Sequence, residues 1–443
     1  MTRMFKKKEL IFISFMLFSM FFGAGNLIFP AFLGRSAGED VWISLAGFIL
    51  TAVGLPILGV MAVAKAGSLH TLAMRVHPGF AFLFPLLIYV SIGPGLAIPR
   101  AGSISFEMGL KPFLPESLMN QPFMLLMYTI VFFAITLWLS LQPSKLVDRF
   151  GKLLTPILLV MIVVIFVKAV FTPIGSFGQA TGVYANNSFF QGFLDGYLTM
   201  DALAALVFGI VVANTIRAKG VDSPKLISRY MSIAGIGAGI LLASIYGILA
   251  YLGASSATIG QPENGAQVLT LVMNSLFGQG GIIMLGMLFT LACLCVCIGL
   301  IIACSQYFTG IFPKLSYKKW AVILAVLSLL VANLGLTQIL TVSVPILGAI
   351  YPIAVVLITL GLMSAKVSKQ VYLFTILFTG IFSVLETINL TFFAGAMDSV
   401  LANVPLYDQG VGWLVPAIVG ALVGYVLSTI MKSSSDVDSD LAA

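Results

Sequence analysis

The sequence predicts an all-α membrane protein with about twelve transmembrane helices. Sixty per cent of its 443 residues are hydrophobic, 9% are charged, and the mean hydropathy is +1.09. Apolar runs of about twenty residues recur along the chain, which is the length that a helix needs to cross the hydrocarbon core. The alternating short segments of a membrane β-barrel do not occur. A water-soluble globule and a β-barrel are therefore both excluded.

Twelve apolar stretches are candidate spans. They are residues 10–34, 41–64, 80–98, 122–141, 153–171, 193–216, 231–252, 280–308, 320–334, 339–362, 371–393 and 411–430. If the amino terminus is cytoplasmic, 19 of the 23 Lys and Arg residues fall on the inner side. Basic residues favour the cytoplasmic side, so this asymmetry predicts an even number of spans with both termini inside. The net charge of +7 follows from that topology and indicates no nucleic-acid partner.

The first span contains the clearest interruption. Gly23, Ala24, Gly25 and Asn26 lie at bilayer depth, and Pro30 follows four residues later. Glycine weakens a helix interior by about 1 kcal/mol, and proline removes a backbone donor. An opened backbone is tolerated in the membrane only where protein buries it or where it lines a watery cavity. The interruption therefore predicts a binding site for a small charged solute.

The sixth span is interrupted at a corresponding place. It carries Asp195, Gly196, Thr199 and Asp201 in otherwise apolar sequence. Paired interruptions in oppositely oriented units are typical of inverted-repeat transporters. We expect a first repeat at 1–172, an inverted second repeat at 191–362, two additional helices at 371–430 and a disordered cytoplasmic tail at 433–443.

Three charged residues in the membrane are functional candidates. Asp201 contacts a substrate or cation, or else it caps the helix that follows it. Arg100 and Glu107 are seven residues apart and so share a helix face. They form a structural pair near the outer surface or a gate.

Three blocks of sequence resemble the bacterial branched-chain amino acid carriers, the BrnQ or LIVCS family. The blocks are residues 22–30, residues 92–100 together with Ser105, Phe106 and Glu107, and residues 199–204. The resemblance implies cation-coupled symport of leucine, isoleucine and valine across the bacterial inner membrane, usually with Na⁺. It also implies the LeuT-type fold, in which the first and sixth spans are unwound around the substrate.

The expected substrate site combines two poles and an apolar pocket. Helix amino termini attract anions, so Ala24, Gly25 and Asn26 suit a carboxylate. Thr199, Asp201 and the opened carbonyls of span six suit an ammonium group. The substrate-binding residues predicted on this basis are Phe22, Gly23, Ala24, Gly25, Asn26, Tyr197, Thr199 and Asp201, with Phe21 and Phe208 as further pocket candidates. Alternatively, the glycines only permit close helix crossing.

The cation site departs from the family pattern. The family typically has a Thr-Thr pair in span eight, where this chain has Cys295 and Val296. Na⁺ prefers oxygen ligands, which neither side chain supplies. The candidate cation residues are Ser19, Phe22, Thr290, Cys295 and Val296. Proton coupling through Asp201 or Glu107, or loss of tight coupling, remains an alternative to Na⁺.

Other functions fit less well. The same fold could carry another small zwitterion or an amine. A membrane enzyme would need a metal cluster or a nucleophile with its base, and a channel would need repeated pore segments or charge rings. The sequence shows none of these. We expect no cofactor and no metal beyond Na⁺, and the oligomeric state is not predicted.

Overall fold

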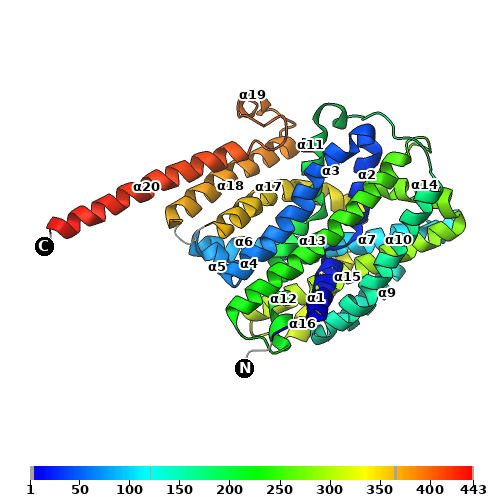
Figure 1. Ribbon diagram of the computed structural model, residues 1–443, viewed down its shortest axis with the longest axis horizontal. Coiled ribbons are helices and arrows are strands. Elements are labelled where there is room, and N and C mark those ends of the chain that lie inside the picture. The colour runs from blue at the N-terminus through cyan, green and yellow to red at the C-terminus, as the bar shows by residue number, and fades with distance from the viewer. Residues whose placement is uncertain (1–3, 120, 364–366, 442–443) are drawn as a thin grey trace.

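The computed structural model describes residues 4–119, 121–363 and 367–441, and these residues fold into helices without any strand (Figure 1). Most of the long helices pack into one bundle. Helices α18 and α20 pair on one side of it, away from α9 and α10. The amino terminus lies at the end of the bundle where α1 begins.

The first six spans contain most of the irregular backbone. Their helices are α1 (Lys7–Phe21), α2 (Ala24–Ala37), α3 (Val41–Ile49), α4 (Leu55–Ala66), α6 (Pro78–Val90), α7 (Ala97–Gly109), α9 (Pro122–Ser140), α10 (Thr155–Phe171), α11 (Tyr184–Asp195) and α12 (Asp201–Ala218). Segments of π-helix lie at Leu50–Gly54, Ser91–Gly95 and Val147–Leu154, and η7 (Gly196–Thr199) is a 3-10 turn.

The remaining spans are long continuous helices. They are α13 (Pro224–Ser255), α15 (Gln279–Ile311), α16 (Tyr317–Ala332), α17 (Leu336–Leu362), α18 (Lys369–Phe392) and α20 (Leu414–Leu441). The connecting helices are α5 (Leu69–Met74), α8 (Glu116–Met119), α14 (Gly265–Phe277) and α19 (Asp398–Leu401), with 3-10 turns at Gly38–Asp40, Lys111–Phe113 and Pro143–Lys145.

Ten helical stretches in the described part of the chain are long and apolar enough to cross a membrane. The number differs from twelve because Ala24–Ala66 counts as one stretch, although it turns at Gly38, where φ is 52°. In addition, α16 has only 16 residues, or about 24 Å of helix against a hydrocarbon core of about 30 Å. A helix lies at each predicted span, and the number of crossings stays a prediction.

The first span is broken where the sequence indicated. Helix α1 ends at Phe21, and both Phe22 and Gly23 have extended backbones before α2 begins at Ala24. Pro30 does not end the helix, since α2 continues through it to Ala37. The break therefore lies at the glycine, seven residues before the proline.

The sixth span is broken at Met200. This residue has φ 66° and ψ 10°, the left-handed region that side chains other than glycine seldom adopt. Such a conformation costs on the order of 1 kcal/mol, and it is maintained here by the buried surroundings of Met200. The strained residue separates η7 from α12.

One feature differs from the sequence predictions. The third span is also interrupted, at Gly93, whose ψ of −120° lies outside the helical region. Helix α11 begins at Tyr184 and helix α20 continues to Leu441. The second repeat at 191–362 and the disordered tail at 433–443 stay predictions. Residues 442–443 lie outside the described part, and the division into inverted repeats stays a prediction.

Helices α2 and α13 approach each other through glycines. A Cβ atom on Gly253 would overlap the carbonyl oxygen of Ala31, and one on Gly34 would overlap that of Ala250. Small residues allow helix backbones in a membrane to pack this closely. The contact fixes the outer half of the broken first span against a continuous helix.

Gly253→Val should lower the melting temperature of the protein in detergent, because the new side chain meets backbone that cannot rotate away. Overpacking usually costs about 1–3 kcal/mol. Gly247→Val is the matched control in the same helix, since no atom lies within 4 Å of a Cβ built there. Equal melting temperatures for the two variants would contradict the packing described.

Candidate functional site

A hydrogen-bond network joins the two broken helices. Asn26 Nδ2 donates to Asp201 Oδ2 at 2.5 Å and to the Tyr246 hydroxyl at 2.5 Å. The Tyr246 hydroxyl also donates to Asp201 Oδ2, at 3.1 Å. Asn26 Oδ1 accepts the backbone N–H of Gly23 at 3.0 Å. The side chain of Asn26 is thus fully used in bracing the break in span one to the first residue of α12.

The carboxylate of Asp201 is held mainly through one of its oxygens. Asn26 and Tyr246 both donate to Oδ2, and Thr199 adds a further side-chain hydrogen bond to the carboxylate. Asp201 is the first residue of α12 and Met200 is its N-cap residue, and the Asp201 carboxylate accepts from the side chains of Asn26 and Tyr246. The carboxylate therefore faces the space between the breaks and does not serve as a helix cap.

Arg100 reaches the same region from α7. It is 6% exposed, and its Nη1 donates to the carbonyl of Leu198 in η7 at 3.0 Å. The predicted pairing with Glu107 is absent, because Glu107 instead forms an ion pair of 2.8 Å with Lys111. Residues four apart are nearer neighbours on a helix than residues seven apart, which explains the different partner.

A small cavity of about 30 Å³ lies between the two breaks. A water molecule needs about 10–15 Å³, so this space holds about two waters and no amino acid. Its lining residues are Met20, Phe21, Gly23, Ala24, Gly25, Asn26, Ile92, Ala97, Arg100, Ala101, Thr199, Met200, Asp201, Ala204, Val296 and Leu300. Six of the eight predicted substrate residues are among them.

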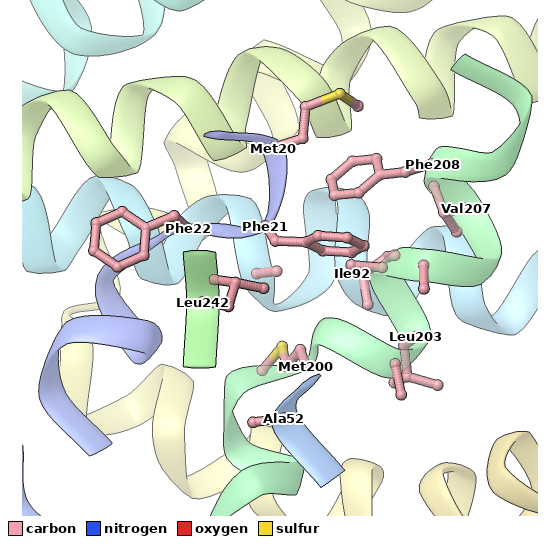
Figure 2. Close-up of a cluster of buried hydrophobic side chains, with 14 of the residues drawn as sticks. Met20, Phe21, Phe22, Ala52, Ile92, Met200, Leu203, Val207, Phe208 and Leu242 are labelled. Atoms are coloured by element: carbon pink, nitrogen blue, oxygen red, sulfur yellow. The ribbon is translucent and has the colours of Figure 1, made fainter. Parts of the chain in front are cut away.

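Phe22 and Tyr197 are the two that the cavity does not include. Phe22 stacks on Phe18 with ring centroids 5.0 Å apart, and Figure 2 shows its ring directed away from that of Phe21. Tyr197 stacks on Tyr351 at 4.2 Å. Consecutive residues leaving a helix end point in different directions, so only one of the two phenylalanines can face the cavity.

Apolar side chains close the cavity toward α12. The rings of Phe21 and Phe208 lie 5.5 Å apart, and Figure 2 shows them together with Ile92 and Val207. Phe208 is fully buried and packs behind Phe21, outside the cavity lining. The predicted apolar pocket is therefore present with different members, Met20, Ile92 and Met200 among them.

Two larger cavities lie beyond the central one. One of about 390 Å³ shares Gly25 and Arg100 with it and extends past Phe29 and Glu107 to Gln267 of α14. The other, of about 360 Å³, lies near the carboxyl-terminal ends of α12 and α15, beside Asn214, Lys219 and Gln306. By the predicted topology, the first is an outer vestibule and the second an inner vestibule.

The predicted cation residues come together only in part. Ser19 Oγ lies 2.5 Å from Thr155 Oγ1 of α10, and Thr155 donates to the carbonyl of Phe15. Cys295 is hydrogen-bonded to Ser19. Val296 packs against Gly23, close to where a Cβ on that glycine would stand.

Thr290 does not join this group, because its hydroxyl lies 3.3 Å from that of Tyr128. The hydroxyls of Ser19 and Thr155 already satisfy each other, and α15 contributes a thiol and an isopropyl group. These side chains do not fit the oxygen ligands that Na⁺ requires. Among the described residues there is also no cluster of three or more His, Cys, Asp or Glu that could hold a metal ion.

Besides the apolar lining residues, three residues at or beside the site were not predicted. Tyr246 lies on a regular helix, and a tyrosine in an apolar run carries no distinguishing signal. Thr155 is recognisable only from its packing against α1. Gly93 lies in a Gly-Pro-Gly sequence that indicates a break, so this one could have been found.

The comparisons with known proteins agree with this geometry. Residues 6–431 match the family model described as branched-chain amino acid transport protein. The chain is 47% identical over 440 residues to the branched-chain amino acid permease BraB of Bacillus subtilis, covering 97% of this chain and 98% of the relative. It is 38% identical over 430 residues to the branched-chain amino acid permease BrnQ of Escherichia coli, covering 96% and 97%.

Two solved structures share the fold. MhsT in complex with L-phenylalanine matches with a TM-score of 0.58 at 16% identity, over 94% of this chain and all of that one. Mhp1, a nucleobase-cation-symport-1 family transporter, matches with a TM-score of 0.61 at 13% identity, over 96% and 93%. These likenesses show the LeuT-type architecture that the three sequence blocks implied. The chain belongs to the branched-chain amino acid transport protein family and is a multi-pass membrane transporter.

Proposed function

We propose that this protein imports leucine, isoleucine and valine as a secondary active symporter that works by alternating access. The observation that carries the proposal is the pair of helix breaks facing each other across a cavity too small for an amino acid, with one larger cavity that adjoins it and a second at the other ends of its helices. Family membership and the named substrates of the relatives support the substrate class. The charge asymmetry of the loops supports the bacterial inner membrane with both termini cytoplasmic.

The residues of the cavity suit the parts of an amino acid. Asp201 offers to an ammonium group its Oδ1, which neither Asn26 nor Tyr246 binds, while Phe21, Ile92 and Met200 offer apolar surface to a side chain. A charged side chain placed there would be buried without a partner, which is strongly unfavourable. One methylene, by contrast, changes affinity by only about 1–3 kcal/mol. The site therefore suits several branched apolar amino acids rather than one.

The small size of the central cavity supports alternating access. Its 30 Å³ cannot hold leucine, so binding requires Phe29 and Arg100 to move on the outer side, and release requires Phe21 and Phe208 to move on the inner side. The outer vestibule already shares Gly25 and Arg100 with the central cavity, whereas the inner vestibule shares no lining residue with it. Opening toward the inner side therefore requires the larger rearrangement.

The driving cation has two candidates. Na⁺ is implied by the family resemblance. The proton is favoured by the buried Asp201 carboxylate between the breaks, and by the thiol and isopropyl group that α15 places where oxygen ligands would be needed. One charge crossing 100 mV supplies about 2.3 kcal/mol, so a single cation suffices for about fiftyfold accumulation.

Leucine, isoleucine and valine should inhibit one another's uptake at similar concentrations, because they differ by at most one methylene. Lysine and glutamate should not compete, since each would bury an unpaired charge. The measurement is inhibition of radiolabelled leucine uptake into cells or proteoliposomes by each unlabelled amino acid. Displacement of leucine by glutamate as effective as that by valine would contradict the proposed pocket.

Asp201→Asn should weaken leucine binding by about tenfold or more, because it removes the charge that faces the ammonium group while keeping the shape of the side chain. The measurement is leucine-induced stabilisation of the purified protein against heat. Asp148→Asn is the matched control, since that carboxylate is exposed and paired with Lys152. Unchanged leucine binding in Asp201→Asn would remove Asp201 from the site.

In proteoliposomes, a proton gradient should drive leucine uptake more strongly than a Na⁺ gradient, because the side chains beside α15 do not fit Na⁺. Cys295→Thr combined with Val296→Thr should increase the response to Na⁺ by restoring two hydroxyls. Cys304→Thr is a control on the same helix, where the thiol contacts the carbonyl of Tyr89 instead. Uptake by the unmodified protein that depends on Na⁺ alone would place a working sodium site elsewhere.

A further inference from the structure

Arg100 is a buried cation whose hydrogen-bonding capacity is mostly unused. Within the described residues its only hydrogen bond from the guanidinium is Nη1 to Leu198, and no carboxylate forms an ion pair with it. A guanidinium group carries five N–H donors. A charged group in a membrane interior needs compensation, and such residues usually mark a ligand or an ion pathway. The remaining donors therefore call for an anionic partner.

The guanidinium lies at the amino terminus of α2. Its Nη2 is 3.2 Å from the position that a Cβ on Gly25 would occupy, so the absence of a side chain at Gly25 makes room for it. Helix α7 starts at Ala97, directly after the interruption at Gly93, and this start places Arg100 between the two other breaks. All three interrupted spans thus meet at this group.

Some of the backbone N–H groups at the amino terminus of α2, where a carboxylate was expected to bind, already have other acceptors. The N–H of Gly23 is bound by Asn26 Oδ1, and the N–H of Ala24 is directed to the thiol of Cys293. The amide of Asn26 donates both of its hydrogens to Asp201 and Tyr246. The donors that remain at this end of the cavity are the backbone N–H groups of Gly25 and Asn26 in the first turn of α2 and the charged N–H groups of Arg100.

Arg100 also lies on the route into the cavity. Apart from Gly25, it is the residue that lines both the central cavity and the outer vestibule. A carboxylate arriving from the outer vestibule reaches this guanidinium before it reaches Asp201. The opposite charges of Arg100 and Asp201 lie close enough to interact, without forming an ion pair.

We propose that Arg100 binds the α-carboxylate of the substrate and so restricts transport to amino acids over the corresponding amines. This inference rests on the proposed function. The substrate then lies with its carboxylate at Arg100 and its ammonium group at Asp201, which offers Oδ1. Arg100 and the ionised Asp201 thus bind the two charges of the zwitterion, and the apolar wall of the cavity contacts its side chain.

The test compares leucine with leucinol, in which an alcohol replaces the carboxylate. Binding of each ligand is measured separately, as its stabilisation of the purified full-length protein against heat. The unmodified protein should prefer leucine by about a hundredfold. Arg100→Gln should weaken the binding of leucine by about tenfold to a hundredfold and the binding of leucinol by less than about threefold, because only leucine loses charge-assisted hydrogen bonds.

Arg35→Gln is the matched control, since Arg35 lies at the far end of α2 and binds the carbonyls of Ser256 and Gly260. Its preference for leucine should equal that of the unmodified protein. If Arg100→Gln does not fold, Arg100→Lys replaces it. Lysine keeps the charge but loses the planar pair of donors, so its preference for leucine should fall by about tenfold.

An unchanged preference for leucine over leucinol in the Arg100 variant overturns the proposal. If the binding of leucine and of leucinol weakens equally, Arg100 has a structural role through Leu198. If the binding of neither ligand weakens, Arg100 has no role at the site. These results leave the proposed function intact. Failure of the unmodified protein to bind leucine, isoleucine or valine overturns the proposed function itself, and the role of Arg100 with it.

Discussion

The hydrogen bonds that join Asn26, Asp201 and Tyr246 are the interaction on which the site depends. A bilayer offers no water to the backbone groups that a broken helix exposes, so each break must be satisfied by protein. Asn26 does this for span one by accepting the N–H of Gly23, and it donates at the same time to Asp201 at the start of α12. Tyr246 adds a connection to the continuous helix α13. Three helices are thereby held around a polar centre.

The hydrogen bonds among Asn26, Asp201 and Tyr246 leave Arg100 and part of the Asp201 carboxylate available to a substrate. Asn26 and Tyr246 bind only Oδ2 of Asp201, and because the side chain of Asn26 is fully used, Arg100 is the charged donor at the cavity. A site that binds both charges of an amino acid needs a cation and an anion near each other that do not neutralise each other. The separate hydrogen bonds of Arg100 to Leu198 and of Asp201 to Asn26 keep the two charges apart. The apolar residues around Phe21 then limit the space beside both charges to about two waters.

Much of this arrangement could be predicted from the sequence, and the reason is the membrane. Glycine, asparagine and aspartate stand out in apolar sequence, so Gly23, Asn26 and Asp201 identified the breaks and the site. The partners of these residues could not be predicted, because they depend on how helices rotate. Tyr246 looks like any other tyrosine in a span, and the pairing of Glu107 with Lys111 rather than Arg100 follows from local helix geometry. The replacement of hydroxyls by Cys295 and Val296 was visible in the sequence, whereas the contact between Ser19 and Thr155 was not.

The most direct test of this account is an experimental structure of the protein with bound leucine. The account predicts leucine between residues 23–26 and residues 199–201, with its carboxylate at Arg100, its ammonium group at Asp201 Oδ1, and the hydrogen bond between Asn26 and Asp201 intact. Leucine bound outside the two helix breaks, or a bound state in which Asn26 and Asp201 have separated, would contradict it.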